Sequence, residues 1–300
     1  MSIVERALEK AALNRAASTD TAIAARAPRR VVGKATAVDA ELPADDGKYI
    51  AIQPEALRAA GLAAPADMEH RLAEELRLIK RPLLMNAESA ETYLANGNLV
   101  MMASALPGAG KTFLSLNLAM SMASELDWSV LLIDADVVRP TLSRKLGLGD
   151  APGLANLLEE ERGDFVDYVY KTSVPGLHLL PAGTARSNVK ELLSSQRMLS
   201  LVAALQAHHS RRIVMFDSPP LLLTSEARVL ASYVGQILVV VESGVTLRRS
   251  LLDAIETLDP TKAINLVLNK NWQPLGLGDH QYGYGDYTPF ERRGDDKTEG

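Results

Sequence analysis

Short, continuously apolar segments alternate with longer segments of helical periodicity from residue 99 onward. Continuous apolar segments are typical of strands buried on both faces, whereas apolar residues three or four positions apart are typical of amphipathic helices. The expected strands span residues 99–104, 129–134, 177–181, 212–217, 236–242 and 264–269. The expected helices span residues 111–125, 187–207, 225–232 and 247–257, with shorter turns over 141–170. This alternation predicts an α/β fold, a mainly parallel sheet with helices on both faces.

The residues before 99 divide into three segments by their pattern. Helical spacing near the start of the chain is carried by Ile3, Val4, Ala7, Leu8 and Ala11. We expect an amphipathic helix over residues 1–16, which either packs on its own domain or docks to a partner. Residues 17–47 are rich in Ala, Arg, Pro and Asp without periodicity and are predicted to be a flexible linker. Residues 48–98 are expected to hold a short strand, a helix near Pro54–Ala60 and a longer helix around Met68–Ile79.

A phosphate-binding motif joins the expected strand 99–104 to the helix that follows it. Residues 105–112 read Ala-Leu-Pro-Gly-Ala-Gly-Lys-Thr, which matches the P-loop pattern GxxxxGK[ST] except that Ala105 replaces the first glycine. A glycine-containing turn between a strand and a helix aims backbone N–H groups and the helix dipole at phosphates. Lys111 is expected to reach the β- and γ-phosphates, and Thr112 a magnesium ion. The candidate nucleotide-binding residues here are Gly108, Ala109, Gly110, Lys111, Thr112 and Phe113.

Carboxylates follow two other expected strands at the point where each strand ends. Strand 129–134 runs into Asp134-Ala135-Asp136, and strand 212–217 runs into Asp217-Ser218-Pro219-Pro220. Because the carboxyl ends of parallel strands meet at one edge of a sheet, we expect these carboxylates to converge with the P-loop. Aspartate also commonly ends a strand as a turn residue, which is the alternative interpretation of either motif alone. Together with the P-loop, the motifs predict a magnesium site in which Thr112, Asp134 and Asp217 hold the ion directly or through water.

These motifs together resemble the bacterial tyrosine kinases, P-loop autokinases that accompany capsule and exopolysaccharide export. In that family the strand-end Asp-x-Asp is called Walker A′, and the Asp-Ser-Pro-Pro segment is called Walker B. The family often has arginine two residues after Walker A′, where this chain has Val138 followed by Arg139. The resemblance implies a P-loop NTPase architecture similar to MinD and ParA, with ATP and Mg²⁺ bound in a kinase domain over residues 99–275.

Two further segments are similar to motifs of the same family. Residues 74–80 read Glu-Glu-Leu-Arg-Leu-Ile-Lys and resemble the oligomerisation helix Glu-x-x-Arg-x-x-Arg, with Lys80 in place of the final arginine. The resemblance therefore implies an oligomerisation role for Glu74, Arg77 and Lys80 within segment 48–98. Residues 188–193 read Asn-Val-Lys-Glu-Leu-Leu and are similar to the family's Asn-Pro-x-Glu-Leu-Leu.

Phosphoryl transfer depends mainly on positioning and charge neutralisation, and the catalytic candidates follow from that requirement. Lys111 is expected to stabilise charge on the γ-phosphoryl group, and Asp136 to orient or deprotonate the attacking tyrosine hydroxyl. The roles of Asp134 and Asp136 can be exchanged, because both lie on one short strand-end loop.

The identity of the nucleotide's base is indicated by a motif at the end of the last expected strand. Asn269-Lys270-Asn271 follows the Asn-Lys-x-Asp motif of GTPases, but position 272 is Trp in place of the aspartate that reads guanine, so ATP is favoured. Asn269 is a candidate adenine contact, and a turn-forming asparagine is the alternative.

Three tyrosines cluster near the end of the chain, at Tyr282, Tyr284 and Tyr287. Glycine alternates with tyrosine there and a charged run follows, so residues 276–300 are predicted to be a disordered tail. The family resemblance implies that the three tyrosines are autophosphorylation sites. The alternative is a merely solvated low-complexity tail.

Composition limits the compartment and the partners. The net charge of −5 gives no argument for nucleic acid, the chain has no cysteine, and no apolar run approaches the roughly 20 residues that span a bilayer. The start of the chain shows no secretory signal, so a cytoplasmic location is expected. The resemblance implies a ring-like homo-oligomer with phosphorylation between subunits, protein substrates in polysaccharide synthesis, and peripheral attachment to the inner membrane through a separate Wzz-like chain-length-determining activator.

Two other functions remain as alternatives. A MinD- or ParA-like positioning ATPase would dimerise around ATP without kinase activity. That subclass carries an extra lysine early in the P-loop, where this chain has Leu106. A degenerate subunit that only regulates export would not need Lys111, Asp136 and Asp217, which are all retained.

Overall fold

The structure is a computed structural model that describes residues 48–88, 94–160, 163–184, 189–207 and 211–271. The expected helix 1–16, the linker 17–47 and the tyrosine tail 276–300 lie outside the described residues. The described residues all belong to one compact unit. The described parts of segment 48–98 therefore belong to the same unit as the P-loop domain.

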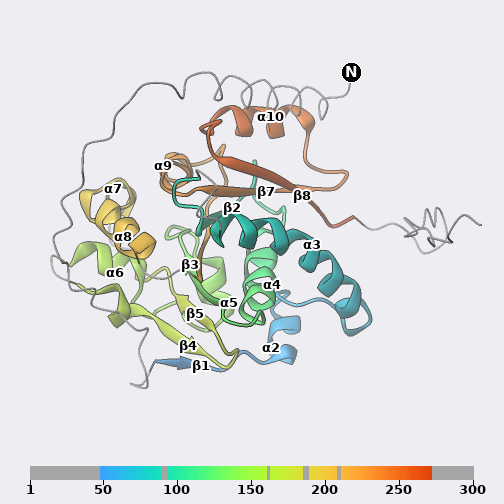
Figure 1. Ribbon diagram of the computed structural model, residues 1–300, viewed down its shortest axis with the longest axis horizontal. Helices are drawn as coiled ribbons and strands as arrows, with labels where there is room; N and C mark the ends of the chain where they lie inside the picture. The colour runs from blue at the N-terminus through green and yellow to red at the C-terminus, as the bar shows by residue number, and fades with distance from the viewer. Residues whose placement is uncertain (1–47, 89–93, 161–162, 185–188, 208–210, 272–300) are drawn as a thin grey trace, which may run out of the picture. The chain divides into compact units, whose positions relative to one another are not determined.

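One sheet organises the described part of the chain (Figure 1). Its strands are β1 (Tyr49–Ile50), β2 (Leu99–Ala103), β3 (Ser129–Asp134), β4 (Tyr170–Thr172), β5 (Leu177–Leu180), β6 (Arg212–Asp217), β7 (Gln236–Glu242) and β8 (Ala263–Asn269). They lie in the order β1-β4-β5-β3-β6-β2-β7-β8. All strands from β5 to β8 along this order are parallel, whereas β4 pairs antiparallel with β5 and β1 pairs parallel with β4. This confirms the expected mainly parallel sheet.

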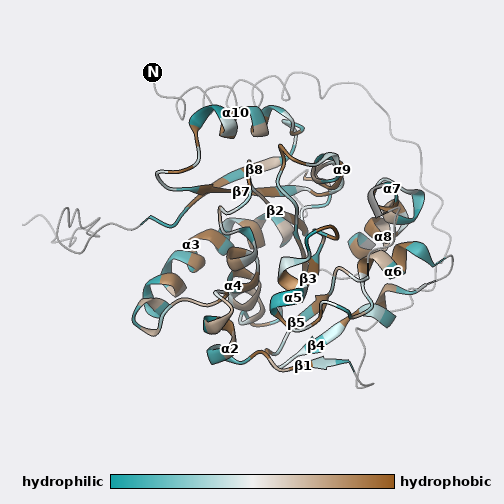
Figure 2. Cartoon of the chain, turned by 180° about the vertical axis from the view of Figure 1, so that it is seen from behind, coloured by the Kyte–Doolittle hydropathy of each residue, from teal (hydrophilic) through white to brown (hydrophobic). Residues whose placement is uncertain are grey.

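Helices cover both faces of the sheet, because the strand side chains alternate between two hydrophobic cores. The helices are α2 (Pro54–Ala59), α3 (Glu69–Glu88), α4 (Lys111–Ala123), α5 (Thr141–Lys145), α6 (Leu154–Glu159), α7 (Val189–Leu193), α8 (Gln196–Ala207), α9 (Ser225–Tyr233) and α10 (Arg248–Glu256). In β3, Val130 and Leu132 pack with α2, α3 and α4, whereas Leu131 and Ile133 pack with α6, α8, α9 and α10. Figure 2 shows β2, β7 and α4 as largely hydrophobic and the edge strands β1 and β4 as more polar.

The expected helix 187–207 is two helices in the structure. The break falls between α7 and α8, where the Ser195 hydroxyl accepts a hydrogen bond from the Met198 amide at 3.3 Å and so caps the start of α8. The expected turns over 141–170 contain the short helices α5 and α6, and β4 begins at the end of that range. The residues of β4 are only half-buried, so they form no apolar run that sequence periodicity would detect.

Helix α3 continues to Glu88, well past the expected end at Ile79, although Pro82 lies inside it. Proline removes a helix hydrogen bond and usually bends or ends a helix. Here tertiary contacts hold the second half in place. Leu83 is buried and its carbonyl accepts from Gln236 Nε2 at 2.9 Å, while Asn86 Nδ2 donates to Gln236 Oε1 at 2.8 Å. Among the described helices, none is long and apolar enough to cross a membrane.

Candidate functional site

A cavity of about 680 Å³ opens at the carboxyl ends of the central strands. The sequence-predicted residues that line it are Gly108, Gly110, Lys111, Thr112, Phe113, Asp136, Asp217 and Asn269. Ala109 is buried beside the cavity and Asp134 lies behind it, so neither lines it. The loop between α2 and α3 and the first turns of α3 form a further wall, which includes Arg71 and Glu75. The fold therefore brings the P-loop and one carboxylate from each acidic motif to one cavity.

Two glycines of the P-loop have a left-handed backbone conformation. Gly108 and Gly110 have φ angles of 91° and 95°, in the left-handed region that glycine adopts most easily. A side chain at Gly110 would also place its Cβ 2.2 Å from Asn269 Nδ2. Ala105 is buried in the core and does not have a positive φ, so alanine replaces the first glycine of the pattern without backbone strain.

Lys111 is the first residue of α4 and lines the cavity. Its Nζ donates to Ser104 Oγ at 3.0 Å, and Ser104 Oγ in turn donates to the Leu106 carbonyl at 2.6 Å. Burial lowers the pKa of Lys111, and the charges of Asp217 and Asp136 oppose that shift. The ammonium group thus lies near the P-loop and two carboxylates. There an ATP phosphate oxygen can replace Ser104 Oγ as the acceptor of its hydrogen bond.

Asp217 supplies the second acidic group, at the end of β6. The Ser115 hydroxyl donates to its Oδ1 at 2.9 Å, and Thr112 hydrogen-bonds it as well. Burial raises the pKa of Asp217 to about 6. Within the described residues no three His, Asp or Glu side chains are grouped to hold a metal alone. Mg²⁺ usually binds through one or two carboxylates and substrate phosphates, so the oxygens of Thr112 and Asp217 fit this ion as part of a nucleotide complex.

Asp134 and Asp136, which the sequence could not distinguish, have different surroundings. Asp134 is fully buried, and its Oδ2 accepts from the Ser143 amide at 2.8 Å and the Ser143 hydroxyl at 2.7 Å. Burial and the neighbouring Asp217 raise its pKa to about 7. Asp136 is half-buried and lines the cavity, and burial also raises its pKa. Of these two aspartates, Asp136 is therefore the one that a bound molecule can reach.

The end of β8 lies against the P-loop. Asn269 Nδ2 donates to the Ala109 carbonyl at 2.8 Å, and Lys270 Nζ donates to the Gly108 carbonyl at 2.8 Å. Lys270 Nζ also pairs with Glu242 Oε1, at the end of β7, at 2.9 Å. Asn269 is thus at the cavity, and its amide contacts the P-loop backbone.

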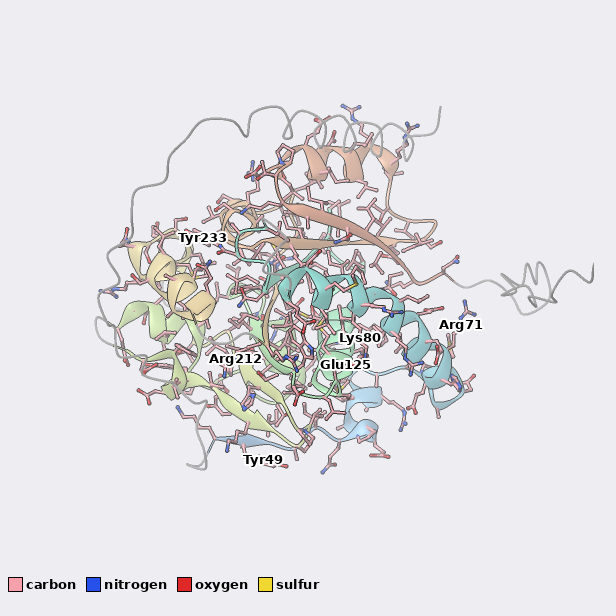
Figure 3. All side chains as sticks on the ribbon, in the orientation of Figure 1. Tyr49, Arg71, Lys80, Glu125, Arg212 and Tyr233 are labelled. Atoms are coloured by element: carbon pink, nitrogen blue, oxygen red, sulfur yellow. The ribbon has the colours of Figure 1, made fainter. Side chains whose placement is uncertain are left out.

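Two residues of the oligomerisation motif are exposed on α3, whereas the third is buried. Glu74 and Arg77 are exposed and pair with each other at 2.8 Å. Lys80 is 8% exposed, donates to the Ser121 carbonyl at 2.8 Å and pairs with Glu125 at 2.7 Å (Figure 3). Lys80 therefore attaches α3 to the end of α4 within the same chain.

Several functional contacts were not predicted from the sequence. Ser104, Ser115 and Ser143 each hold a charged group of the site, yet an isolated serine carries no spacing signal. Lys270 has no signal in the sequence beyond its place in a GTPase-like pattern. Tyr282, Tyr284 and Tyr287 lie outside the described residues.

Comparisons with known proteins agree with this site. Residues 100–231 match the CobQ/CobB/MinD/ParA nucleotide binding domain family. Putative tyrosine-protein kinase EpsB of Ralstonia solanacearum is 34% identical over 193 residues, which cover 64% of this chain and 25% of EpsB. The chain thus spans about a quarter of the length of that relative. The crystal structure of the VpsO kinase domain is 30% identical with a TM-score of 0.56, over 68% of this chain and 98% of that one.

A relative of more similar extent is tyrosine-protein kinase YwqD of Bacillus subtilis. It is 30% identical over 223 residues, which cover 71% of this chain and 92% of YwqD. The aligned part includes more than the nucleotide-binding domain family alone, since that match covers residues 100–231. With its P-loop, its two strand-end acidic motifs and this extended similarity, the chain belongs to the bacterial tyrosine kinase family.

Proposed function

We propose that this protein is an ATP-dependent tyrosine kinase that phosphorylates its own C-terminal tyrosines Tyr282, Tyr284 and Tyr287, and so regulates exopolysaccharide chain length or export. The observation that supports it best is the single cavity shared by Lys111 and Asp136. A phosphate-binding lysine and a carboxylate that can accept a proton are the two groups required for transfer to a hydroxyl. The tail and its role come from the family resemblance.

In the proposed reaction the phosphates of ATP contact the P-loop amides and Lys111. The carboxylate of Asp136 takes the proton of the tyrosine hydroxyl while the tyrosine oxygen bonds to the γ-phosphorus. The bond between the γ-phosphorus and the bridging oxygen breaks, and ADP leaves. Lys111 stabilises the charge that develops on the phosphoryl oxygens. Mg²⁺, held by Thr112 and Asp217 with the phosphates, would neutralise further charge.

Asp134 acts indirectly in this proposal. Its Oδ2 accepts two hydrogen bonds from Ser143, and its Oδ1 accepts a hydrogen bond from the Asp136 amide N–H at 3.3 Å. It therefore orients the loop that carries Asp136, and a direct contact with the metal would require it to turn away from Ser143. The raised pKa of Asp136, caused mainly by burial, makes that carboxylate a stronger base than an exposed aspartate.

The assembly is part of the proposal. We infer a ring-like homo-oligomer in which the tail of one subunit enters the cavity of the next, with Glu74 and Arg77 at the contact because both are exposed on α3. Phosphates added to neighbouring tails repel each other and favour release. A separate Wzz-like membrane protein would activate the kinase at the cytoplasmic side of the inner membrane, and proteins of polysaccharide synthesis would be its further substrates. Nucleic acid is not among the proposed partners.

The direct test is to incubate purified protein with ATP and Mg²⁺, with and without a cytoplasmic peptide of a candidate activator, and to map phosphorylation by mass spectrometry. Phosphate is expected on the three tail tyrosines and is expected to disappear in Lys111→Met, whose fold is checked by circular dichroism. Replacing the tail tyrosines with phenylalanine should remove most autophosphorylation but spare an added tyrosine peptide. ATP hydrolysis without phosphotyrosine under both conditions would instead favour a MinD- or ParA-like positioning ATPase.

A further inference from the structure

We infer that Lys270 is a positioning residue of the nucleotide site, which holds the P-loop in its phosphate-binding conformation and neutralises Glu242 beside it. The inference rests on the nucleotide binding of the proposed function and does not depend on the kinase reaction. The backbone is unusual at this residue. Lys270 follows directly after β8 with a φ of 57°, in the left-handed region that lysine rarely adopts. Such residues persist where surrounding contacts determine them, and they cluster at functional sites.

The contacts of Lys270 lead to the P-loop. Its Nζ donates to the Gly108 carbonyl at 2.8 Å, and the preceding residue, Asn269, donates to the Ala109 carbonyl at 2.8 Å. Two successive residues at the end of β8 therefore bind two successive carbonyls of the P-loop. The peptide bonds are all trans in the described residues, so each amide N–H points away from the carbonyl of its own peptide plane. The carbonyls of Gly108 and Ala109 face their side-chain donors at the end of β8. The N–H groups of Ala109 and Gly110 therefore point away from β8, where they can bind phosphate.

Lys270 also neutralises the charge of Glu242. The Oε2 atom of Glu242 lies 3.9 Å from the position that a Cβ on Gly108 would take, and the Glu242 side chain is only 18% exposed. A carboxylate so close to the P-loop repels the phosphates of a nucleotide. Lys270 pairs with the other oxygen of Glu242 at 2.9 Å and so cancels this charge. Removing the ammonium group would free the Gly108 carbonyl and expose the nucleotide to an uncompensated carboxylate.

A simple surface ion pair is the competing explanation, and such pairs contribute little to stability. Nucleotide affinity distinguishes the two, because a surface pair would not alter it. We would measure the Kd of Mg–ADP by calorimetry for Lys270→Met and for Lys262→Met. Lys262 lies just before β8 and donates to the Ser232 carbonyl at 3.1 Å, with no contact to the P-loop, so it is the matched control. We expect binding to weaken about tenfold or more in Lys270→Met, as for loss of a charge-assisted hydrogen bond, and to stay unchanged in Lys262→Met.

Two further variants test whether the loss of affinity comes from the missing ammonium group, from the backbone conformation of residue 270 or from the charge of Glu242. Lys270→Gly relieves the left-handed conformation, so it keeps the fold but loses the ammonium group, and its affinity should fall as in Lys270→Met. Adding Glu242→Gln to Lys270→Met should restore part of the affinity, because the uncompensated carboxylate is gone. In the kinase assay Lys270→Met should raise the KM for ATP with little change in kcat.

A Kd within twofold of the wild-type value in both Lys270→Met and Lys270→Gly would overturn the inference. Wild-type protein that binds Mg–ADP but forms no phosphotyrosine would contradict the kinase proposal alone, since the affinity comparison would still decide the role of Lys270. Wild-type protein that binds no nucleotide would overturn both.

Discussion

At the scale of single residues, the site depends on buried polar side chains whose partners are distant in the sequence. Ser143 is the best example, because its hydroxyl donates to Asp134 Oδ2 at 2.7 Å and accepts from the Ala182 amide at 3.0 Å. It thereby joins the loop that carries the acidic motif to the segment after β5. Without this hydroxyl, a fully buried carboxylate and a buried amide each lose a partner.

Ser143→Ala is expected to lower the free energy of unfolding by about 1–3 kcal/mol, the cost of leaving buried polar groups unsatisfied. Urea unfolding followed by circular dichroism measures this change. Ser200→Ala is the control, because Ser200 is exposed on α8 and bonds only to a carbonyl of its own helix. Equal stability of the two variants would show that the contacts of Ser143 do not matter for stability.

His178 makes the stability of the protein dependent on pH. Burial, with smaller contributions from the charges of Arg212 and Lys171, lowers its pKa to about 4, whereas an unfolded histidine titrates near about 6.5. The unfolded state therefore binds more protons between these values, and stability falls as the pH drops from 6.5 towards 4. We expect His178→Gln to lose less stability than wild type between pH 7 and pH 5 in parallel urea titrations. An identical loss in both proteins would assign the acid sensitivity to other groups.

At the scale of secondary-structure elements, α3 connects segment 48–98 to the site. Its first turns form a wall of the cavity through Arg71 and Glu75, and its later turns are attached to the sheet through Gln236. Gln236 is fully buried at the start of β7, and its Nε2 donates to the carbonyls of both Leu83 and Gly97. This one side chain therefore connects α3, the turn before β2 and β7.

Gln236→Leu is expected to destabilise the protein by about 2 kcal/mol or more, because it keeps the volume but removes the hydrogen bonds that Gln236 makes to the Leu83 and Gly97 carbonyls and to the Asn86 amide group. Hydrogen exchange should show the loss concentrated in the second half of α3. Gln206→Leu, at an exposed position of α8, is the control and should change stability by less than about 0.5 kcal/mol. Uniform exchange along the chain would contradict a local role of Gln236.

At the scale of the whole molecule, α3 presents a surface that the rest of the described chain leaves uncovered. Leu78 is 77% exposed and Met85 is 63% exposed, seven residues apart and so on one side of the helix. Glu74 and Arg77 are exposed on the same helix, whereas Lys80 is turned towards Glu125 (Figure 3). Lys80, which replaces the last arginine of the family motif, is therefore not part of the proposed oligomer contact.

The double variant Glu74→Ala/Arg77→Ala is expected to dissociate the oligomer without lowering the free energy of unfolding of the subunit by more than about 0.5 kcal/mol, since an exposed helical ion pair contributes little. Sedimentation analysis measures the assembly. Arg249→Ala/Asp253→Ala removes a comparable exposed pair on α10 and should leave the assembly intact. A monomeric wild-type protein would contradict the proposed ring.

Local patterns predicted most of the fold. Each expected strand from residue 99 onward begins and ends within one residue of the observed strand. For the inner strands the reason is that a continuous apolar run is what burial on both faces requires, whereas the edge strand β8 is apolar although Leu266 and Leu268 are exposed. The patterns missed β4, the break at Ser195 and the extension of α3 past Pro82. These features depend on an antiparallel edge pairing, a side-chain cap and a buried glutamine, none of which produces hydrophobic periodicity.

The sequence by itself determined the chemistry of the site, because a P-loop and strand-end carboxylates in a parallel sheet have their functional atoms at one edge whatever the details of packing. Only the tertiary structure decided which atoms meet. It placed Asp136 at the cavity and Asp134 behind it, turned Lys80 towards Glu125, and brought Lys270 to Gly108 from 162 positions away. Such contacts depend on how helices and strands pack against one another, and packing joins residues that no local pattern relates.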